Sequence, residues 1–538
     1  MKTIYVNGSV FTGRLPLTEA FAVADGKFVA AGTNDALLAM KNADDTVIDL
    51  EGRFVCAGFI DSHMHLLNYG KAMTSCDLTK CTDSIASLKD GLRAFMSAHP
   101  PVEGGWLAGR GWNQDYFTDE IRMPNRHDLD EVTTEYPVMI VRCCGHAMTV
   151  NTRALKLLGL DGTQPQPDGG HYDTEASGYP TGVFRDTAMS MIYTRVPAPS
   201  KAEIKQMLIT ASAALNGYGV TSCHTDDLCS FENVPWQTVI EAYHELESEG
   251  LMTVRVYEQS QFTDLPGLQS FLDAGYVTGK GSDMFRIGPL KLLGDGSLGA
   301  RTAYLSSDYH DAPGSRGLAI FTQQQFDELI GCAHANGMQV AVHSIGDGVL
   351  DMILNSYEKA FGENPRDDHR SGIVHVQITR QDQLERMARL NLHEYVQSIF
   401  IDYDARIVRD RVGEDRAATS YAFHTLKEMG LHVSNGTDCP VEFPEAMRGI
   451  QCAVTRTPVD GSVPAYRPEE AMSVEEALLS YTAEGAHASF EENAKGQIQP
   501  GMLADFVVLD GNPFECAPEK LHSIRPVATY LGGKKVFG

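Results

Sequence analysis

CAGFIDSHMHLLNYG, residues 56–70, is an apolar run that ends in two histidines one residue apart. Successive side chains of a strand point to opposite faces, so Asp61, His63 and His65 share one side of the strand predicted here. Neutral imidazole is a common ligand for transition metals, and zinc accepts ring nitrogens at about 2.0–2.1 Å. The stretch therefore indicates a metal site at a strand end, with a solvated histidine pair as the alternative.

Between residues 205 and 490, short apolar runs alternate with longer helical stretches, which is the pattern of βα repetition. Seven runs are strand candidates: GVTSCHTDD (219–227), MTVRVYEQS (252–260), FRIGPLKLLGDG (285–296), MQVAVHSIGDG (338–348), SGIVHVQIT (371–379), HEYVQSIF (393–400) and HVSNGTDCP (432–440). Intervening segments such as QQFDELIGCAHANG (324–337) have helical periodicity and close on glycine. With the strand in 56–71 the runs make eight, the number of parallel strands in a TIM barrel, or (β/α)8 barrel, which is an α/β fold.

Both ends of the chain read as short strands with turn signals. Residues 1–55 contain Asn-Gly in TIYVNGSVFT and Asp-Gly in FAVADGKFVAAG, each of which predicts a hairpin, and residues 491–538 contain ADFVVLDGNPF and VATYLGGKKVFG. Short strands cannot bury their faces alone, so we expect one small β-sandwich domain built from both termini. Two independent β extensions are the alternative.

Residues 72–204 separate the first predicted barrel strand from the second and are too long for a loop. They contain helical stretches, WLAGRGWNQDYF and the Gly- and Pro-rich GTQPQPDGGHYDTEASGYPTG. We expect an inserted α/β lid subdomain that covers the barrel mouth and shapes specificity.

The bulk numbers exclude several classes of protein. At 538 residues the chain far exceeds the roughly 250–300 at which a single core stops growing, so we expect more than one domain or a large barrel with additions. Its 44 Lys and Arg against 71 Asp and Glu give a net charge of −27, which disfavours nucleic acid and membranes as partners. No long uncharged apolar stretch or signal peptide is visible, and 11 cysteines are scattered without a Cys-x-x-Cys pair. We expect a cytoplasmic protein with reduced thiols that binds a small molecule and forms a homodimer.

Further polar residues interrupt or end the predicted strands: Lys291 in IGPLKLLGDG, His343 after QVAV, His375 after GIV and Asp438 after VSNGT. The strands of a barrel end at one face, so we expect these residues to converge with His63 and His65. Each alone has a structural interpretation, such as a buried histidine bonded to a carbonyl or an aspartate that caps a helix. Their joint appearance in strand order favours a metal centre.

The order His-x-His, Lys, His, His, Asp on successive strands resembles the metal-dependent amidohydrolase superfamily. Further motifs resemble its YtcJ-like branch, which includes N-substituted formamide deformylases: AGFIDSHMHL, GRGWNQDYF, CGHAMTVN, PTGVFRDTA, KLLGDGSLGART, VHSIGDG, HVQITRQD, NGTDCPV and GMLADFVVLD. These motifs span almost the whole chain in the family's order.

The resemblance implies one or two divalent metal ions, with zinc expected, and the ligands His63, His65, Lys291, His343, His375 and Asp438. His63 and His65 would bind the more buried ion, and His343 and His375 the second. Lys291 would be carboxylated by carbon dioxide and would bridge the ions as a carbamate. Asp438 would also be the catalytic proton shuttle.

The resemblance further implies hydrolysis of a C–N bond, amide-like, N-acyl or N-formyl, in a small molecule. A metal-activated hydroxide would attack the carbonyl, and Asp438 would pass its proton to the departing amine. Two alternatives stay open: a lyase or decarboxylase that uses the same metal centre, and a non-catalytic regulatory protein that kept the barrel.

Four other positions are candidates, each with a structural alternative. His146 in CGHAMTVN and Trp112 in GRGWNQDYF are predicted substrate-binding residues, or else a structural histidine and a packing anchor. Arg301 in SLGART is predicted to bind a substrate carboxylate, or else to form a salt bridge within its loop. Asp295 is predicted to orient one of the metal ligands from behind.

Overall fold

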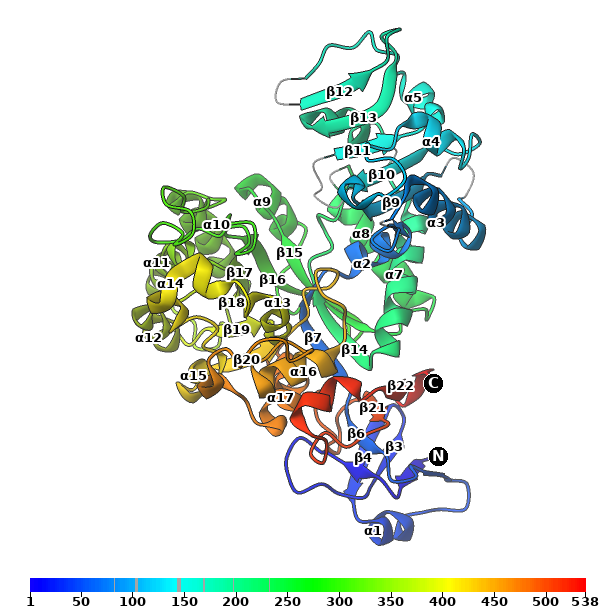
Figure 1. The fold of residues 1–538 in the computed structure, drawn as a ribbon. Coiled ribbons are helices and arrows are strands. Elements are labelled where there is room, and N and C mark those ends of the chain that lie inside the picture. The colour runs from blue at the N-terminus through cyan, green and yellow to red at the C-terminus, as the bar shows by residue number, and fades with distance from the viewer. Residues whose placement is uncertain (82, 102–104, 143–146, 168–169, 197, 232) are drawn as a thin grey trace. The chain divides into compact units, whose positions relative to one another are not determined.

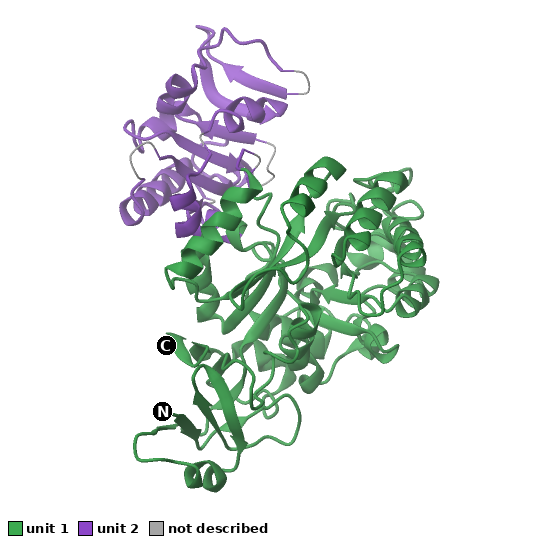
Figure 2. Ribbon diagram, turned by 180° about the vertical axis from the view of Figure 1, so that it is seen from behind, with its two compact units in different colours: residues 1–68, 208–230, 235–538 green, residues 69–207, 231–234 purple. Residues whose placement is uncertain are grey.

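The computed structural model describes residues 1–538 except 82, 102–104, 143–146, 168–169, 197 and 232. The described chain divides into two compact units, shown in Figure 2. Unit 1 comprises residues 1–68, 208–230 and 235–538, and unit 2 comprises residues 69–207 and 231–234.

An eight-stranded sheet forms the centre of unit 1 (Figure 1). Its strands are β7 (Phe59–Met64), β14 (Val220–Thr225), β15 (Arg255–Gln261), β16 (Phe285–Leu293), β17 (Val340–Ser344), β18 (Gly372–His375), β19 (His393–Val396) and β20 (His432–Asn435). They lie in chain order, and every neighbouring pair is parallel. The last strand returns to the first, since the Asp438 N–H donates to His63 O over 2.8 Å. The predicted TIM barrel is therefore confirmed.

Helices alternate with these strands and surround the barrel (Figure 1). They are α7 (Lys201–Gly217), α8 (Trp236–Ser248), α9 (Leu265–Asp273), α10 (Gln323–Ala335), α11 (Asp347–Glu363), α12 (Gln381–Arg389), α13 (Ile401–Asp404), α14 (Val408–Ala417), α15 (Phe423–Glu428), α16 (Ala446–Thr455), α17 (Val474–Ser480) and α18 (Ala483–Ala488). Because helices cover the outer face and side chains fill the interior, the strands are buried on both faces and read as continuous apolar runs.

Helix α10 shows how local sequence sets these boundaries. Thr322 Oγ1 accepts a hydrogen bond from the Gln325 N–H over 3.3 Å, and Gln325 Oε1 accepts one from the Thr322 N–H over 2.9 Å. This capping box satisfies backbone donors at the start of the helix. Gly337 follows the other end with a φ of +81°, a left-handed conformation that costs glycine little.

Unit 1 has two further sheets. The sheet of order β4-β3-β1-β5 uses strands of the N-terminal segment alone, whereas the sheet of order β2-β6-β21-β22-β23 combines strands from both ends of the chain. Their elements are β1 (Thr3–Val6), β2 (Ser9–Val10), β3 (Ala20–Ala24), β4 (Lys27–Gly32), helix α1 (Asn34–Ala39), β5 (Thr46–Asp49), β6 (Phe54–Ala57), β21 (Phe506–Leu509), β22 (Pro526–Leu531) and β23 (Lys534–Phe537). Phe21 of one sheet meets Phe506 of the other edge-on, with ring centroids 5.0 Å apart. Such contacts form the core of the predicted small β-sandwich, and the two termini lie near each other (Figures 1 and 2).

The two turn signals near the N-terminus have different outcomes. Asp25 and Gly26 have positive φ angles of +51° and +77° and join the antiparallel strands β3 and β4, so that hairpin is confirmed. The predicted hairpin at Asn7 is wrong. Strand β1 pairs with β3 and β5, whereas β2 pairs with β6, so the chain changes sheets at this turn.

Unit 2 contains a mixed sheet of order β12-β13-β11-β10-β9-β8 with helices. Its elements are β8 (Cys76–Asp77), α3 (Ile85–Ala98), β9 (Leu107–Trp112), α4 (Arg126–Asp130), β10 (Val138–Arg142), β11 (Ala147–Val150), α5 (Thr152–Leu158), β12 (Gly170–Thr174), β13 (Pro180–Asp186) and α6 (Ser190–Tyr193). Helix α2 (Leu66–Met73) leads into it from unit 1.

Among the described residues, no helix combines the length and apolar character that a membrane span needs. The nine cysteines in that part of the chain are all free thiols, as the scattered spacing predicted.

Candidate metal centre

Polar side chains stand at the carboxyl end of every barrel strand. In strand order they are His63 and His65 (β7), Asp226 (β14), Gln259 (β15), Lys291 (β16), His343 (β17), His375 (β18), Gln397 (β19) and Asp438 (β20). Because all eight strands are parallel, these residues lie at one end of the barrel. The structure thus brings the six predicted ligands to the same place.

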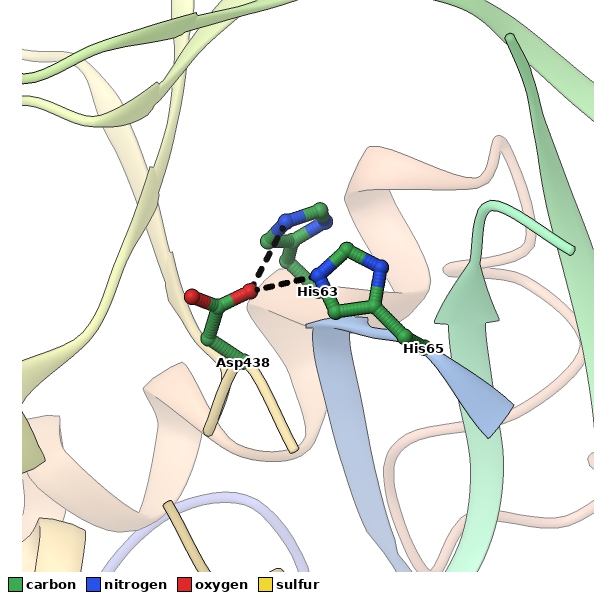
Figure 3. Close-up of side chains that lie close together, drawn as sticks. All are labelled: His63, His65 and Asp438. Atoms are coloured by element: carbon green, nitrogen blue, oxygen red, sulfur yellow. Dashed lines mark hydrogen bonds and ion pairs between the residues drawn. The ribbon is translucent and has the colours of Figure 1, made fainter. Parts of the chain in front are cut away.

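His63, His65 and Asp438 form the closest group (Figure 3). Asp438 Oδ1 lies 2.9 Å from His65 Nε2 and 3.3 Å from His63 Nε2. Asp438 has a φ of +57°, a left-handed conformation that aspartate tolerates better than most residues. The turn after β20 therefore presents the carboxylate to both imidazoles.

Hydrogen bonds fix which ring nitrogen of these histidines is free. Gln259 Oε1 accepts from His63 Nδ1 over 2.7 Å, and Gln259 Nε2 donates to Ser62 O over 3.2 Å, which sets the orientation of the amide. The Nδ1 of His65 donates to the carboxylate of Asp226. Both rings therefore keep a proton on Nδ1 and turn Nε2 toward the carboxylate of Asp438.

His375 is oriented in the same way. Its Nδ1 donates to Gln397 Oε1 over 2.6 Å, while Gln397 Nε2 donates to Tyr395 O over 3.2 Å. Three imidazoles thus have an acceptor behind Nδ1, which leaves Nε2 as the nitrogen that can bind an ion. This arrangement is typical of histidines that bind metal ions, so the donor set fits a divalent metal.

Lys291 is fully buried and lies between the ligand group and Asp226. Its Nζ is 3.4 Å from His63 Nε2 and 3.5 Å from Asp226 Oδ2. Although burial opposes it, the charges of His65 and Lys291 lower the pKa of Asp226 to about 2. The charged carboxylate compensates an ammonium that would otherwise be unpaired in the protein interior.

His343 and His375 form the other part of the centre. Their ring centroids are 4.4 Å apart, and those of His375 and His63 are 5.5 Å apart. His343 Nε2 lies 3.2 Å from Asp295 Oδ1 and 3.2 Å from Gly296 O. Asp295 also accepts three backbone N–H groups, so it contacts a predicted ligand from a fixed position.

The charges of the centre favour a cation. Although burial opposes it, the carboxylates of Asp226 and Asp438 raise the pKa of His65 to about 10, so without an ion this ring carries the positive charge that a bound ion would replace. Burial and the neighbouring His343 lower the pKa of His375 well below its usual range, which keeps this ring in the neutral form that binds metals. The two carboxylates compensate positive charge at this point, and imidazoles that give up their Nε2 proton can hold a divalent ion together with Asp438.

The other predicted residues lie in different surroundings. Trp112 is fully buried and packs in a hydrophobic cluster of unit 2. The guanidinium of Arg301 donates to both carboxylate oxygens of Asp311, over 3.1 and 2.8 Å. His146 lies outside the described residues.

Three residues of the centre were not predicted: Asp226, Gln259 and Gln397. Each lies at the carboxyl end of a strand that the sequence predicted, and each accepts a hydrogen bond from a histidine. The signal that could have identified them is this position, since a polar residue at the carboxyl end of a barrel strand often serves the active site.

Known proteins resemble this chain along its whole length. A model of the amidohydrolase family matches residues 46–537. YtcJ of Bacillus subtilis (strain 168) is 32% identical over 543 residues, which cover 100% of this chain and 99% of that protein. The N-substituted formamide deformylase of Arthrobacter pascens is 25% identical and covers 98% of this chain and 97% of its own. The crystal structure of an uncharacterized metal-dependent hydrolase from Pyrococcus furiosus has a TM-score of 0.79 at 28% identity, over 96% of this chain and 100% of that one.

Proposed function

This chain belongs to the amidohydrolase family and is a metal-dependent amidohydrolase, and from this premise we propose that it hydrolyses a C–N bond in a small molecule. The bond is amide-like, as in an N-acyl or N-formyl amine, and the products are an acid and an amine. The name of the Arthrobacter relative, a formamide deformylase, supports this choice. The observation that carries the proposal is the approach of the Nε2 atoms of His63 and His65 to the carboxylate of Asp438.

The ligand roles in this proposal follow the grouping of the side chains. His63, His65 and Asp438 would hold one divalent ion, with zinc expected from the nitrogen and oxygen donors. His343 and His375 would hold a second ion, and Lys291, if carboxylated, would be a ligand shared by both. When bound, such an ion lowers the pKa of a water ligand and polarises the carbonyl of the substrate.

The protein side chains would perform the proton transfers. Asp438 accepts the proton of the attacking water on its carboxylate and passes it to the departing nitrogen, a step of general acid–base catalysis worth about 10²–10⁴ in rate. Its side chain keeps 10% of its surface exposed, so a substrate can reach it. Gln259 and Asp226 keep the protons of His63 and His65 on Nδ1.

Large apolar side chains are exposed on the segments that follow three barrel strands, one of them in helix α13. They are Leu318 and Ile320 after β16, Tyr403 after β19, and Val441 and Phe443 after β20. We call this set the apolar rim, and it supports a substrate with an aryl or alkyl substituent. Arg301 supports an acidic substrate less well, because Asp311 engages its guanidinium.

A panel of N-formyl and N-acyl amines with aryl, alkyl and acidic substituents tests the proposed function. Release of free amine is measured with the purified protein, after removal of metal by a chelator, and after addition of zinc. We expect release that the chelator abolishes and zinc restores. If no member of the panel yields an amine while carboxylate substrates yield carbon dioxide, the protein is instead a decarboxylase with the same centre.

A further inference from the structure

A second group of metal-ligating side chains lies at the other end of strand β20. His432 is the first residue of this strand, whereas Asp438 follows its last residue. Glu484 and His487 are three residues apart on helix α18 and therefore share one of its faces. The group thus stands at the amino-terminal end of the barrel, away from the candidate metal centre.

The three side chains are close enough to act together. One ligand atom from each of His432, Glu484 and His487 lies within 4.8 Å of the others. His432 Nδ1 is 2.7 Å from Glu484 Oε2, and the rings of His432 and His487 stack with centroids 3.5 Å apart. Two ligands of one zinc ion lie at most about 4.2 Å apart, twice the metal–nitrogen distance. For all three residues to reach one ion, the ring of His432 must turn out of its stack on His487 so that both lone pairs converge. The side chain of His432 is 47% exposed, which leaves it room to rotate.

One nitrogen of the group lacks a partner in the metal-free protein. His487 Nδ1 is buried, and no described residue makes a hydrogen bond to it. A buried polar atom without a partner is costly, which a ligand would relieve. The nearby Arg370 is paired with Glu492 over 2.8 Å, which offsets its charge.

We propose that His432, Glu484 and His487 form a second site for a divalent transition-metal ion of the zinc class, separate from the catalytic centre. Two imidazoles and one carboxylate are a ligand set that zinc uses in proteins, with the remaining position left to water.

The site would stabilise the closure of the barrel. Helix α18 carries two of its ligands and also packs on the first barrel strand, where a Cβ on Gly485 would stand only 2.7 Å from Ile60 Cγ2. An ion that joins His432 to α18 therefore links the last strand to a helix held against the first. Ions that bind only the folded protein stabilise it, so zinc is expected to raise the melting temperature through this site.

The test compares the wild-type protein with His432→Gln and with His424→Gln as a matched control. His424 also faces a glutamate, with His424 Nε2 3.5 Å from Glu428 Oε1, but it belongs to no three-ligand group among the described residues. Zinc is counted by mass spectrometry after dialysis against buffered micromolar zinc, and crystals grown with zinc are measured at the zinc absorption edge.

We expect His432→Gln to lose one equivalent of zinc and the zinc-dependent rise in melting temperature, while His424→Gln retains both. Wild-type crystals should show an anomalous peak between His432 and His487. Amine-releasing activity should not change in His432→Gln. Amine release therefore tests the proposed function, whereas zinc content and melting temperature test this second site independently. Equal zinc content in wild type and His432→Gln, with no peak at His432 in millimolar zinc, would overturn the proposal.

Discussion

Asp226 Oδ2 lies 3.5 Å from Lys291 Nζ, and both side chains are buried at the carboxyl end of the barrel. The other oxygen of the same carboxylate accepts the Nδ1 proton of His65. Asp226 thus has two tasks: it offsets the charge of one predicted ligand and orients another.

Replacing Asp226 with asparagine removes the charge that both neighbours contact. We expect Asp226→Asn to lower metal affinity or kcat/KM about 10- to 100-fold, the usual effect of losing a residue behind a metal ligand. Asp227→Asn is the matched control, since Asp227 bonds the Leu67 N–H and the hydroxyl of Tyr243 instead. A zinc competition titration checks both variants, and equal losses would contradict this role of Asp226.

Carboxylation of Lys291 can be observed directly. Wild-type protein equilibrated with carbon-13 bicarbonate and zinc should show a carbamate resonance by NMR, which Lys291→Ala should lack. The variant should also lose activity, because the proposed shared ligand of the two ions is gone. An active, metal-loaded wild type without this resonance would mean that Lys291 stays an ammonium paired with Asp226.

Substitution of Asp438 separates metal binding from proton transfer. In Asp438→Asn the imidazoles of His63 and His65 remain, so we expect the metal to be retained. The amide cannot accept the proton, and kcat should fall by about 10²–10⁴. Metal analysis and steady-state kinetics test this pair of outcomes, and an empty metal site would refute the division of roles.

The apolar rim should affect substrate choice rather than chemistry. Phe443 is 61% exposed on the loop after β20, so its replacement leaves no cavity in the core. We expect Phe443→Ser to raise KM for aryl substrates about tenfold or less, the effect of a partial loss of apolar contact, with kcat for a short formamide unchanged. Leu251 is 45% exposed on the turn before β15, at the opposite end of the barrel, and provides the control as Leu251→Ser. A uniform loss of kcat would contradict a binding role.

Glu394 of strand β19 should make stability depend on pH. It is fully buried, neither carboxylate oxygen has a partner among the described residues, and burial raises its pKa well above the usual 4.5. The folded protein thus holds the Glu394 proton more tightly than the unfolded chain does, and the resulting stabilisation is complete below pH 4.5. As the pH rises from 4.5 through the pKa of the folded protein, the free energy of unfolding falls by about 1.4 kcal/mol per pH unit.

The isosteric Glu394→Gln removes this titration. We expect it to melt higher than the wild type at pH 8, with a smaller difference at pH 5, in thermal unfolding measured at both values. Glu385→Gln, on the exposed surface of α12, should leave the pH profile unchanged. A wild-type melting temperature that does not respond to this substitution at pH 8 would show that Glu394 is not a buried acid of this kind.

The barrel and its six ligand candidates could be predicted from sequence because both are local signals. A strand covered on both faces is a short apolar run, and Lys291, His343 and Asp438 stand out as polar residues where such runs end. The count of eight runs then gave the fold, which placed all of these ends at one face.

The tertiary structure decided the relations between strands. Gln259 and Gln397 are chemically ordinary amides, and their role depends on contact with the Nδ1 of a histidine on another strand. The turn at Asn7 looked like a hairpin, yet β2 joins a different sheet, because the pairing of a strand is chosen by burial against distant partners. Sequence alone determined which residues end the strands of this protein, whereas only the folded chain set which atoms face each other there, because those distances depend on packing across the whole barrel.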